Sequence, residues 1–183
     1  SWWTFAANAN YLDSTGNLDA VEHDPHTQEN QAILVNGSST FKLGYGAVTA
    51  MRGPYVVGYT NGERLVVITG EPSHKSTALE WTAGRRTALG PGIAYGVNDR
   101  GDAVGNNDPN LAGQGAPTLW RAGRAVRLTD APGSAYAIGD DGTIVGQIND
   151  SAFLVRGSDT SRKVVRIDKL LGKSPWHVNA AYA

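Results

Sequence analysis

The residues best suited to chemistry lie in one polar stretch near the start of the chain. Residues 22–31 read EHDPHTQENQ and hold two of the four histidines, three positions apart and flanked by carboxylates. Imidazole and carboxylate groups act as general acids and bases, and both ligate metal ions. Glu22, His23, Asp24 and His26 are therefore candidate site residues, for binding a hydroxyl-rich ligand or for acid–base catalysis.

A metal ion is one interpretation of this stretch, because the four side chains are suitable ligand types. A loop leaves their directions open, however, and a solvated polar loop is the simpler interpretation. The metal ligands and catalytic residues therefore stay unknown. No cofactor is predicted, because the chain has no glycine-rich phosphate loop, no nucleophile-elbow serine and no His-Glu-x-x-His helix.

Three other polar stretches resemble this one in their place after a short predicted strand. They contain Tyr59, Asn106, Asn107 and Gln147. If the strands belong to repeat units arranged around an axis, the four stretches emerge on one face, where ligands of such folds commonly bind. The eight candidates then form a rim of amides, carboxylates, imidazoles and a tyrosine, which suits a hydroxyl-rich ligand.

The elements that must position this rim form a repeat. Its clearest copy runs from Ile93 to Leu128, and the next begins at Ala135. Each copy has a small apolar strand, a glycine turn, a Val-Gly strand, a polar loop and two further strands. The glycines of the last turn are spaced by 47, 39 and 34 residues, and they are Gly37, Gly84, Gly123 and Gly157. A repeat of this size is the propeller-blade pattern.

The predicted fold is therefore all-β, a propeller-like array of about four four-stranded units in one repeat domain over residues 1–183. The units cover approximately residues 8–46, 47–92, 93–133 and 134–173. The tripeptide Arg100-Gly101-Asp102 matches an adhesion motif, but here it is the repeat's own hairpin turn, with Gly101 at positive φ. Residues 65–69 (LVVIT) form a continuous apolar run and are predicted as a buried strand.

The segments AYGVNDRGDAVG, AYAIGDDGTIVG and SAFLV, with the closing Leu-Gly pair, resemble the bacterial extracellular HAF repeats. The third and fourth units carry the resemblance. The first two follow it in outline, with Met51-Arg52-Gly53 in place of the Asn-Asp-x-Gly turn. The resemblance implies a propeller-like all-β fold and an exported protein, secreted or extracellular. It brings no catalytic residues to this chain.

The last residues, 174–183, begin a further strand, since Ala181-Tyr182-Ala183 repeats Ala135-Tyr136-Ala137. An unpaired strand edge is expected to find a partner. Three arrangements stay open: a longer array, closure of this strand onto the first unit, or pairing with a second copy in a homo-oligomer.

Composition limits the partners. Lys and Arg number 16 against 17 Asp and Glu, which gives a net charge of −1. Nucleic acid is therefore not expected as a partner, and Arg85-Arg86 and Arg162-Lys163 are interpreted as solvated strand ends. The absence of cysteine excludes disulfides and thiolate metal sites. No apolar run approaches the roughly 20 residues that span a bilayer.

The sequence thus predicts an exported binding module that recognises a glycan or a protein surface through loops on one face. The alternative is an enzyme of the lyase or hydrolase type, with a carboxylate and histidine site on the same face, metal-assisted or not. A binding module predicts weaker binding after substitution of Tyr59 and Asn106, without a lower melting temperature. An enzyme predicts a bell-shaped pH–rate profile that is lost in His23→Ala. A structural spacer would have no concave polar pocket.

Overall fold

The computed structural model describes residues 7–12, 17–23, 30–36, 39–61, 75–83, 85–108, 114–156, 163–171 and 181. Over these ranges the chain forms sixteen β-strands and one short helix. The strands make four separate sheets, each of four antiparallel strands paired in chain order. The prediction of an all-β chain built from four antiparallel sheets is confirmed.

The sheets follow one another along the chain. The first holds β1 (Ala7–Leu12), β2 (Asn17–His23), β3 (Asn30–Asn36) and β4 (Ser39–Tyr45). The second holds β5 (Ala47–Arg52), β6 (Tyr55–Asn61), β7 (Ser76–Thr82) and β8 (Arg85–Pro91). The third holds β9 (Ile93–Val97), β10 (Ala103–Asn106), β11 (Pro117–Arg121) and β12 (Arg124–Arg127). The fourth holds β13 (Gly133–Ile138), β14 (Ile144–Ile148), β15 (Ser151–Val155) and β16 (Val165–Arg166), with α1 (Ile167–Leu170) after it.

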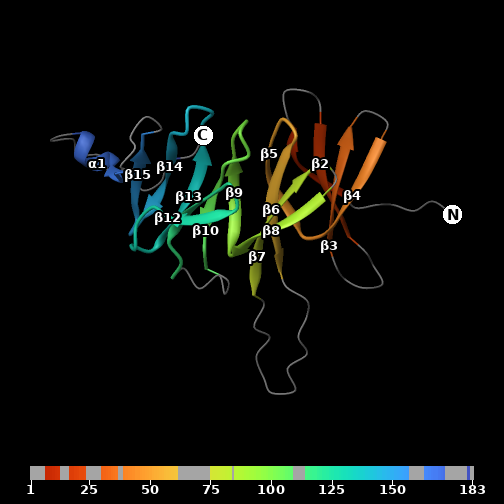
Figure 1. Ribbon diagram of the computed structural model, residues 1–183, viewed down its shortest axis with the longest axis horizontal. Coiled ribbons are helices and arrows are strands. Elements are labelled where there is room, and N and C mark those ends of the chain that lie inside the picture. The colour runs from red at the N-terminus through yellow and green to blue at the C-terminus, as the bar shows by residue number, and fades with distance from the viewer. Residues whose placement is uncertain are drawn as a thin grey trace, which may run out of the picture.

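The four sheets lie in a row in chain order, with the first and fourth at opposite ends (Figure 1). The first strand of each sheet packs on the sheet before it: β5 contacts β1, β2 and β3, β9 contacts β5, β6 and β7, and β13 contacts β9, β10 and β11. The strands β5, β9 and β13 are therefore neighbours, and they run along one side of the stack.

An apolar core fills each of the three spaces between sheets. Leu79 and Trp81 belong to the core between the first and second sheets, and Trp120 to the next core. Val56 and Val57 are adjacent on β6, yet both are buried, in these two different cores. An inner sheet is covered on both faces, which explains why its strands read as short continuous apolar runs instead of alternating ones.

A β-bulge interrupts the first strand of every sheet. The register skips one residue between Ala94 and Gly96, so Tyr95 is left without a partner on β10. The residues at this position in the four sheets are Asn10, Thr49, Tyr95 and Tyr136. A bulge re-aims the side chain of its extra residue and bends the strand.

The bulge explains the glycine of the repeated Val-Gly pair. A Cβ atom on Gly105 would lie 1.9 Å from the Ile93 carbonyl oxygen, and one on Gly58 would lie 1.9 Å from that of Ala47. In the fourth sheet the corresponding distance, from Gly146 to the Ser134 oxygen, is 2.1 Å. The bent first strand thus brings its backbone so close to the second that only glycine fits.

Side chains also join the sheets through backbone carbonyls. Trp81 Nε1 donates to the Leu43 oxygen at 2.8 Å, from the second sheet to the first. Thr49 Oγ1 donates to the Ala94 oxygen at 2.5 Å, from the second sheet to the third. These bonds satisfy polar groups that lie at the edges of the apolar cores.

The Asn-Asp-Arg-Gly turn is a clamp between the third and fourth sheets. Asn98 is buried, its Oδ1 accepts from the Arg100 and Asp102 amides at 3.1 and 3.0 Å, and its Nδ2 donates to the Gly139 oxygen at 3.3 Å. Gly101 has φ +75° in this turn between β9 and β10. The adhesion-like tripeptide therefore lies in a structural turn, as predicted, with Asp102 buried.

Some predictions concern residues outside the described ranges. The apolar run at residues 65–69 is one, and of the predicted strand at residues 174–183 only Ala181 is described. No helix in the described ranges combines the length and the apolar character needed to cross a membrane.

Candidate functional site

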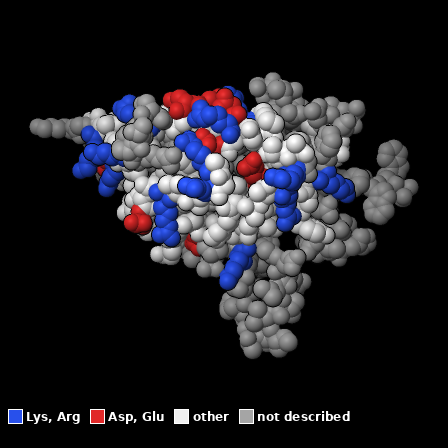
Figure 2. All heavy atoms as spheres, viewed as in Figure 1, with Lys and Arg blue, Asp and Glu red and all other residues white. Residues whose placement is uncertain are grey.

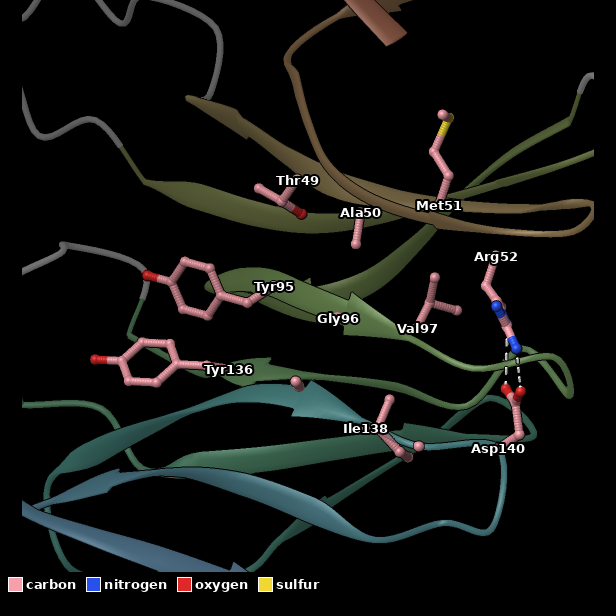
Figure 3. A pocket seen from close by; sticks show the side chains of 12 residues that line it. Thr49, Ala50, Met51, Arg52, Tyr95, Gly96, Val97, Tyr136, Ile138 and Asp140 are labelled. Atoms are coloured by element: carbon pink, nitrogen blue, oxygen red, sulfur yellow. Dashed lines mark hydrogen bonds and ion pairs between the residues drawn. The ribbon is translucent and has the colours of Figure 1, made fainter. Parts of the chain in front are cut away.

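A groove of about 310 Å³ lies along the strands β5, β9 and β13 (Figure 3). Because these are the first strands of three successive sheets, each contributes the bulge residue and its neighbours to the lining. Tyr95 and Tyr136 lie side by side and point toward one end of the groove, and Arg52 and Asp140 meet at the other. The groove thus has an aromatic end and a charged end.

Tyr95 and Tyr136 form an aromatic pair. Their ring centroids are 5.7 Å apart and the rings are tilted by 60°. Both residues are half-buried and both occupy the bulge position of their strand, which turns them out of the sheet ladder and into the groove. Paired rings with exposed surface offer an apolar platform whose hydroxyl tips can still form hydrogen bonds.

A row of polar groups continues from this pair across three sheets. The Tyr136 hydroxyl donates to Gln147 Oε1 at 3.1 Å, and Gln147 Nε2 donates to Asp150 Oδ1 at 3.5 Å. Burial raises the pKa of the Tyr95 phenol, and the neighbouring phenols of Tyr136 and Tyr59 raise this pKa further. We call Tyr59, Tyr95 and Tyr136 the tyrosine row. A phenol hydroxyl can both donate and accept a hydrogen bond.

The charged end of the groove is held by an ion pair. The Arg52 guanidinium binds the Asp140 carboxylate through two nitrogens, with Nε to Oδ1 at 3.3 Å. Asp140 Oδ1 also accepts from the Asp99 amide at 3.1 Å, and Arg100 donates to the Asp140 carbonyl oxygen. The bond from Arg52 and then the one from the Asp99 amide hold the pKa of Asp140 below its usual range. This carboxylate is therefore an acceptor in fixed contacts and a poor proton acceptor.

Two of the residues selected from the sequence border the tyrosine row. Tyr59, Asn106 and Gln147 occupy equivalent positions, directly after the bulge glycines Gly58, Gly105 and Gly146. This position lies beside the bulge residue of the first strand. Tyr59 belongs to the row and Gln147 accepts from the hydroxyl of its last member, so both lie next to the candidate groove, and their role in binding stays a prediction.

The side-chain amides of Asn106 and Asn107 form hydrogen bonds within the protein that stabilise the fold. Asn106 Nδ2 donates to the Gly133 oxygen at 2.5 Å and to Ser134 Oγ at 3.3 Å, and Oδ1 accepts from the Asp108 amide at 2.6 Å. Asn107 Oδ1 accepts from the Ala116 amide at 2.8 Å. Asn106 is 9% exposed and joins the third sheet to the fourth.

The acidic and histidine-bearing stretch is only partly described. Glu22 and His23 belong to β2, where they pair with Gln31 and Asn30 of β3, so the strand continues into the stretch expected to be a loop. Asp24 and His26 lie outside the described residues. Within the described ranges, no three His, Asp, Glu or Cys side chains gather as a metal ion would require.

Sequence reasoning did not select Tyr95 and Tyr136 as site residues. A signal was available: both are large aromatic residues at the same repeat position, in strands whose other members are small, Ala94 and Gly96 around one and Ala135 and Ala137 around the other. Comparison with protein-family models, with curated protein sequences and with solved structures finds no match.

Proposed function

We propose that this protein is a binding module that holds an uncharged, hydroxyl-rich glycan in the groove along β5, β9 and β13. The observation that carries the proposal is the Tyr95–Tyr136 ring pair, aimed into the groove from two bulges. Sugar rings have apolar C–H faces that pack on aromatic rings, and hydroxyls that hydrogen-bond at the ring edges.

The polar groups of the groove support an uncharged ligand. Tyr95 and Tyr136 line the groove, and Gln147, which accepts from the Tyr136 hydroxyl beside it, has an uncharged side chain. At the other end Arg52 and Asp140 neutralise each other, so neither a ligand cation nor a ligand anion finds an unopposed charge there. A polar group of the ligand would instead compete with water for the outer lone pairs and N–H groups of this pair.

The polar groups of the groove also favour a binding protein over an enzyme. General acid–base catalysis needs a proton-exchanging group poised near the working pH. Among the described residues of the groove, the one carboxylate is Asp140, whose pKa is held low by Arg52 and the Asp99 amide. The enzyme alternative is therefore not favoured by any group that lines the described groove.

The experiment is calorimetric titration with neutral oligosaccharides of glucose, xylose, mannose and N-acetylglucosamine. We expect Tyr136→Ala and Tyr95→Ala to weaken binding by about tenfold or more, because each removes an aromatic face. Tyr45→Ala is the matched control, since Tyr45 is 47% exposed and lies on β4, away from the groove. Equal loss in the control, or unchanged binding in both groove variants, would contradict the proposal.

The finer architecture and the location are part of the same proposal. We infer that the four sheets are blades of a propeller-like ring whose inner strands are β5, β9 and β13, supported by their adjacency and by the stacking of sheets in chain order. A second copy closing this ring would double the molar mass measured by light scattering. Export to the cell exterior is supported by the resemblance to HAF repeats, and fractionation of expressing cells tests it.

A further inference from the structure

The outer strands of the second and third sheets carry a concentration of arginine. β8 begins Arg85-Arg86 and β12 has Arg124 and Arg127 at its two ends, and all four side chains are exposed. β8 and β12 contact each other, so the four arginines lie on two neighbouring edge strands. Figure 2 shows several blue side chains over the part of the molecule that holds these strands, with red side chains beside them. We call Arg85, Arg86, Arg124 and Arg127 the arginine face.

Most of these guanidinium groups have no partner among the residues that the structure describes. Among the described residues, Arg85, Arg86 and Arg124 form no ion pair or hydrogen bond, and the guanidinium of Arg86 extends over Gly44 of the first sheet. Within the described ranges Arg127 pairs with Asp130 alone, at 3.7 Å, and the side chains are 62% and 95% exposed. A pair so exposed contributes little and exchanges readily with another anion. The hydrogen-bond donors of this face are therefore available.

Most of the described acidic residues lie away from β8 and β12, except Glu80 of β7, which is the register partner of Thr87, and Asp130 beside Arg127. Asp99, Asp140 and Asp141 belong to the turns after β9 and β13, and Asp102 is buried against Arg121. Neither β8 nor β12 contains an acidic residue. With a net charge of only −1 over the whole chain, the excess of positive charge on β8 and β12 reflects where the charged residues lie and not an overall basic composition.

The choice of arginine is informative. β8 and β12 are edge strands in their sheets, and a charged side chain on an edge strand discourages pairing with other chains. Lysine is the usual residue for that purpose, but neither strand contains lysine. Arginine differs in its planar fork of donors, which matches carboxylate and sulfate groups in a bidentate geometry. Protection of the sheet edge explains why these strands carry charged residues. It does not explain why every charged residue on them is arginine.

We propose that the arginine face binds an acidic polysaccharide, a polymer that carries carboxylate or sulfate groups along its length. The other exposed residues in the first half of β8 and in β12 are Thr87, Ala88, Ala125 and Val126, whose side chains are short. Short side chains would let an extended polymer lie close to the strands. Its successive anionic groups could then contact successive guanidinium groups. This site is separate from the groove, so it does not rest on the binding of a neutral glycan.

A polysaccharide fits this face better than a nucleic acid does. Proteins that bind single strands stack bases on aromatic side chains beside the basic groups, and duplex binders place a helix or a strand pair in a groove. Neither β8 nor β12 contains an aromatic residue. The face therefore offers charge and bidentate donors without a surface for stacking.

The test measures binding of the whole protein to polygalacturonate, which carries carboxylates, and to heparin, which carries sulfates, with dextran as the uncharged polymer. The variant is Arg85→Gln/Arg124→Gln, which removes two charges and keeps side chains of similar reach. We expect binding to both acidic polymers to weaken about tenfold or more in this variant, because two charge-assisted contacts are lost. The control is Lys75→Gln/Lys169→Gln, two exposed lysines outside the arginine face, and it should bind as the native chain does.

Comparison of the two acidic polymers identifies whether carboxylate or sulfate is preferred. Binding should also weaken between about 0.05 M and about 0.3 M NaCl, since exposed charges are screened. Three results would overturn the proposal: no binding to either acidic polymer at the lower salt, equal weakening in the lysine control, or tighter binding to single-stranded or duplex DNA than to either polymer. Circular dichroism of each variant confirms that the sheets are intact.

Discussion

Arg52 and Asp140 are 88 residues apart in the sequence and form an ion pair that joins the second sheet to the fourth. The pair passes over the turn of the third sheet, whose Asp99 amide and Arg100 guanidinium also bind Asp140. Three consecutive units are thus tied together at one end of the groove, and the first strands are held in the arrangement that brings Tyr95 beside Tyr136.

This pair should stabilise the protein cooperatively and in a pH-dependent way. Because the pKa of Asp140 is lowered in the folded state, its contribution is present above the unfolded pKa of about 4 and is lost as the pH falls through the lower folded value. The side chains are 51% and 38% exposed, so Asp140→Asn should lower the melting temperature only slightly, by at most roughly 3 °C, and less at high salt.

A double-mutant cycle with Arg52→Gln measures the coupling. The double variant should melt close to the single variants, whereas simple addition of the two decreases would show that the residues act independently. Asp130→Asn, in an exposed pair on the outer surface, should leave the melting temperature unchanged.

Asp102 should matter far more than Asp140. Its carboxylate is buried and accepts from Arg121 Nε at 2.7 Å and Nη2 at 2.5 Å. Asp102→Ala should lower the free energy of unfolding by about 2 to 3 kcal/mol, a value reduced from that of a fully buried pair because Arg121 is partly exposed. Asp99→Ala, an exposed residue of the same turn, should cost under about 0.5 kcal/mol. Urea unfolding measures both, and equal losses would contradict this role.

The same carboxylate predicts how stability changes with pH. Burial raises the pKa of Asp102, but the hydrogen bonds from Arg121 and Asn98 outweigh it and hold the pKa below the ordinary value of 3.8. The stabilisation is therefore complete above about pH 4 and is lost as the pH falls through the lower folded value. Between neutral pH and about pH 3, Asp102→Ala should lose less stability than the native chain does.

Gly105 should be far less tolerant of substitution than a glycine in a turn. Gly105→Ala places a Cβ atom 1.9 Å from the Ile93 oxygen, and the bulge that presents Tyr95 must move to accommodate it. We expect a loss of about 2 to 4 kcal/mol. Gly123→Ala meets nothing within 4 Å and suffers only the strain of φ +74°, about 1 kcal/mol. Chemical denaturation ranks the two, and the reverse order would show that the close approach is not rigid.

Tyr95 should be detectable by its ionisation. Burial, and then the neighbouring phenols of Tyr136 and Tyr59, raise its pKa above 10.0, so its phenolate should form late in a titration followed by phenolate absorbance. Since the folded pKa is raised, the stabilisation it gives is complete below about pH 10 and is lost as the pH rises through the folded value. Tyr95→Phe should remove the late phase and Tyr45→Phe should not. A late phase that persists in Tyr95→Phe would exclude this assignment.

The sequence predicted the strands well because glycine turns and short apolar segments recur at the same positions in each unit. It indicated Tyr59 and Gln147 because both follow the Val-Gly strand that the repeat marks. Tyr95 was not selected, because a period-two pattern does not show which residue a bulge leaves unpaired, although the recurrence of a large aromatic residue between small neighbours was a signal. The sequence also did not show that the Asn106 amide already forms a hydrogen bond within the protein. Its partner, the Gly133 carbonyl, belongs to the next sheet, so this contact depends on how the sheets stack.

The bulge also bears on how such a chain evolves. Its extra residue has no register partner on the neighbouring strand, and it is Asn10, Thr49 or Tyr95 in three of the sheets while the ladder around it is preserved, even though the Thr49 hydroxyl also bonds to the Ala94 oxygen of the next sheet. Each duplication of the unit therefore adds one position at which a single substitution alters recognition without remaking the scaffold. In an array of this kind, ligand recognition can change through single substitutions at the bulge positions.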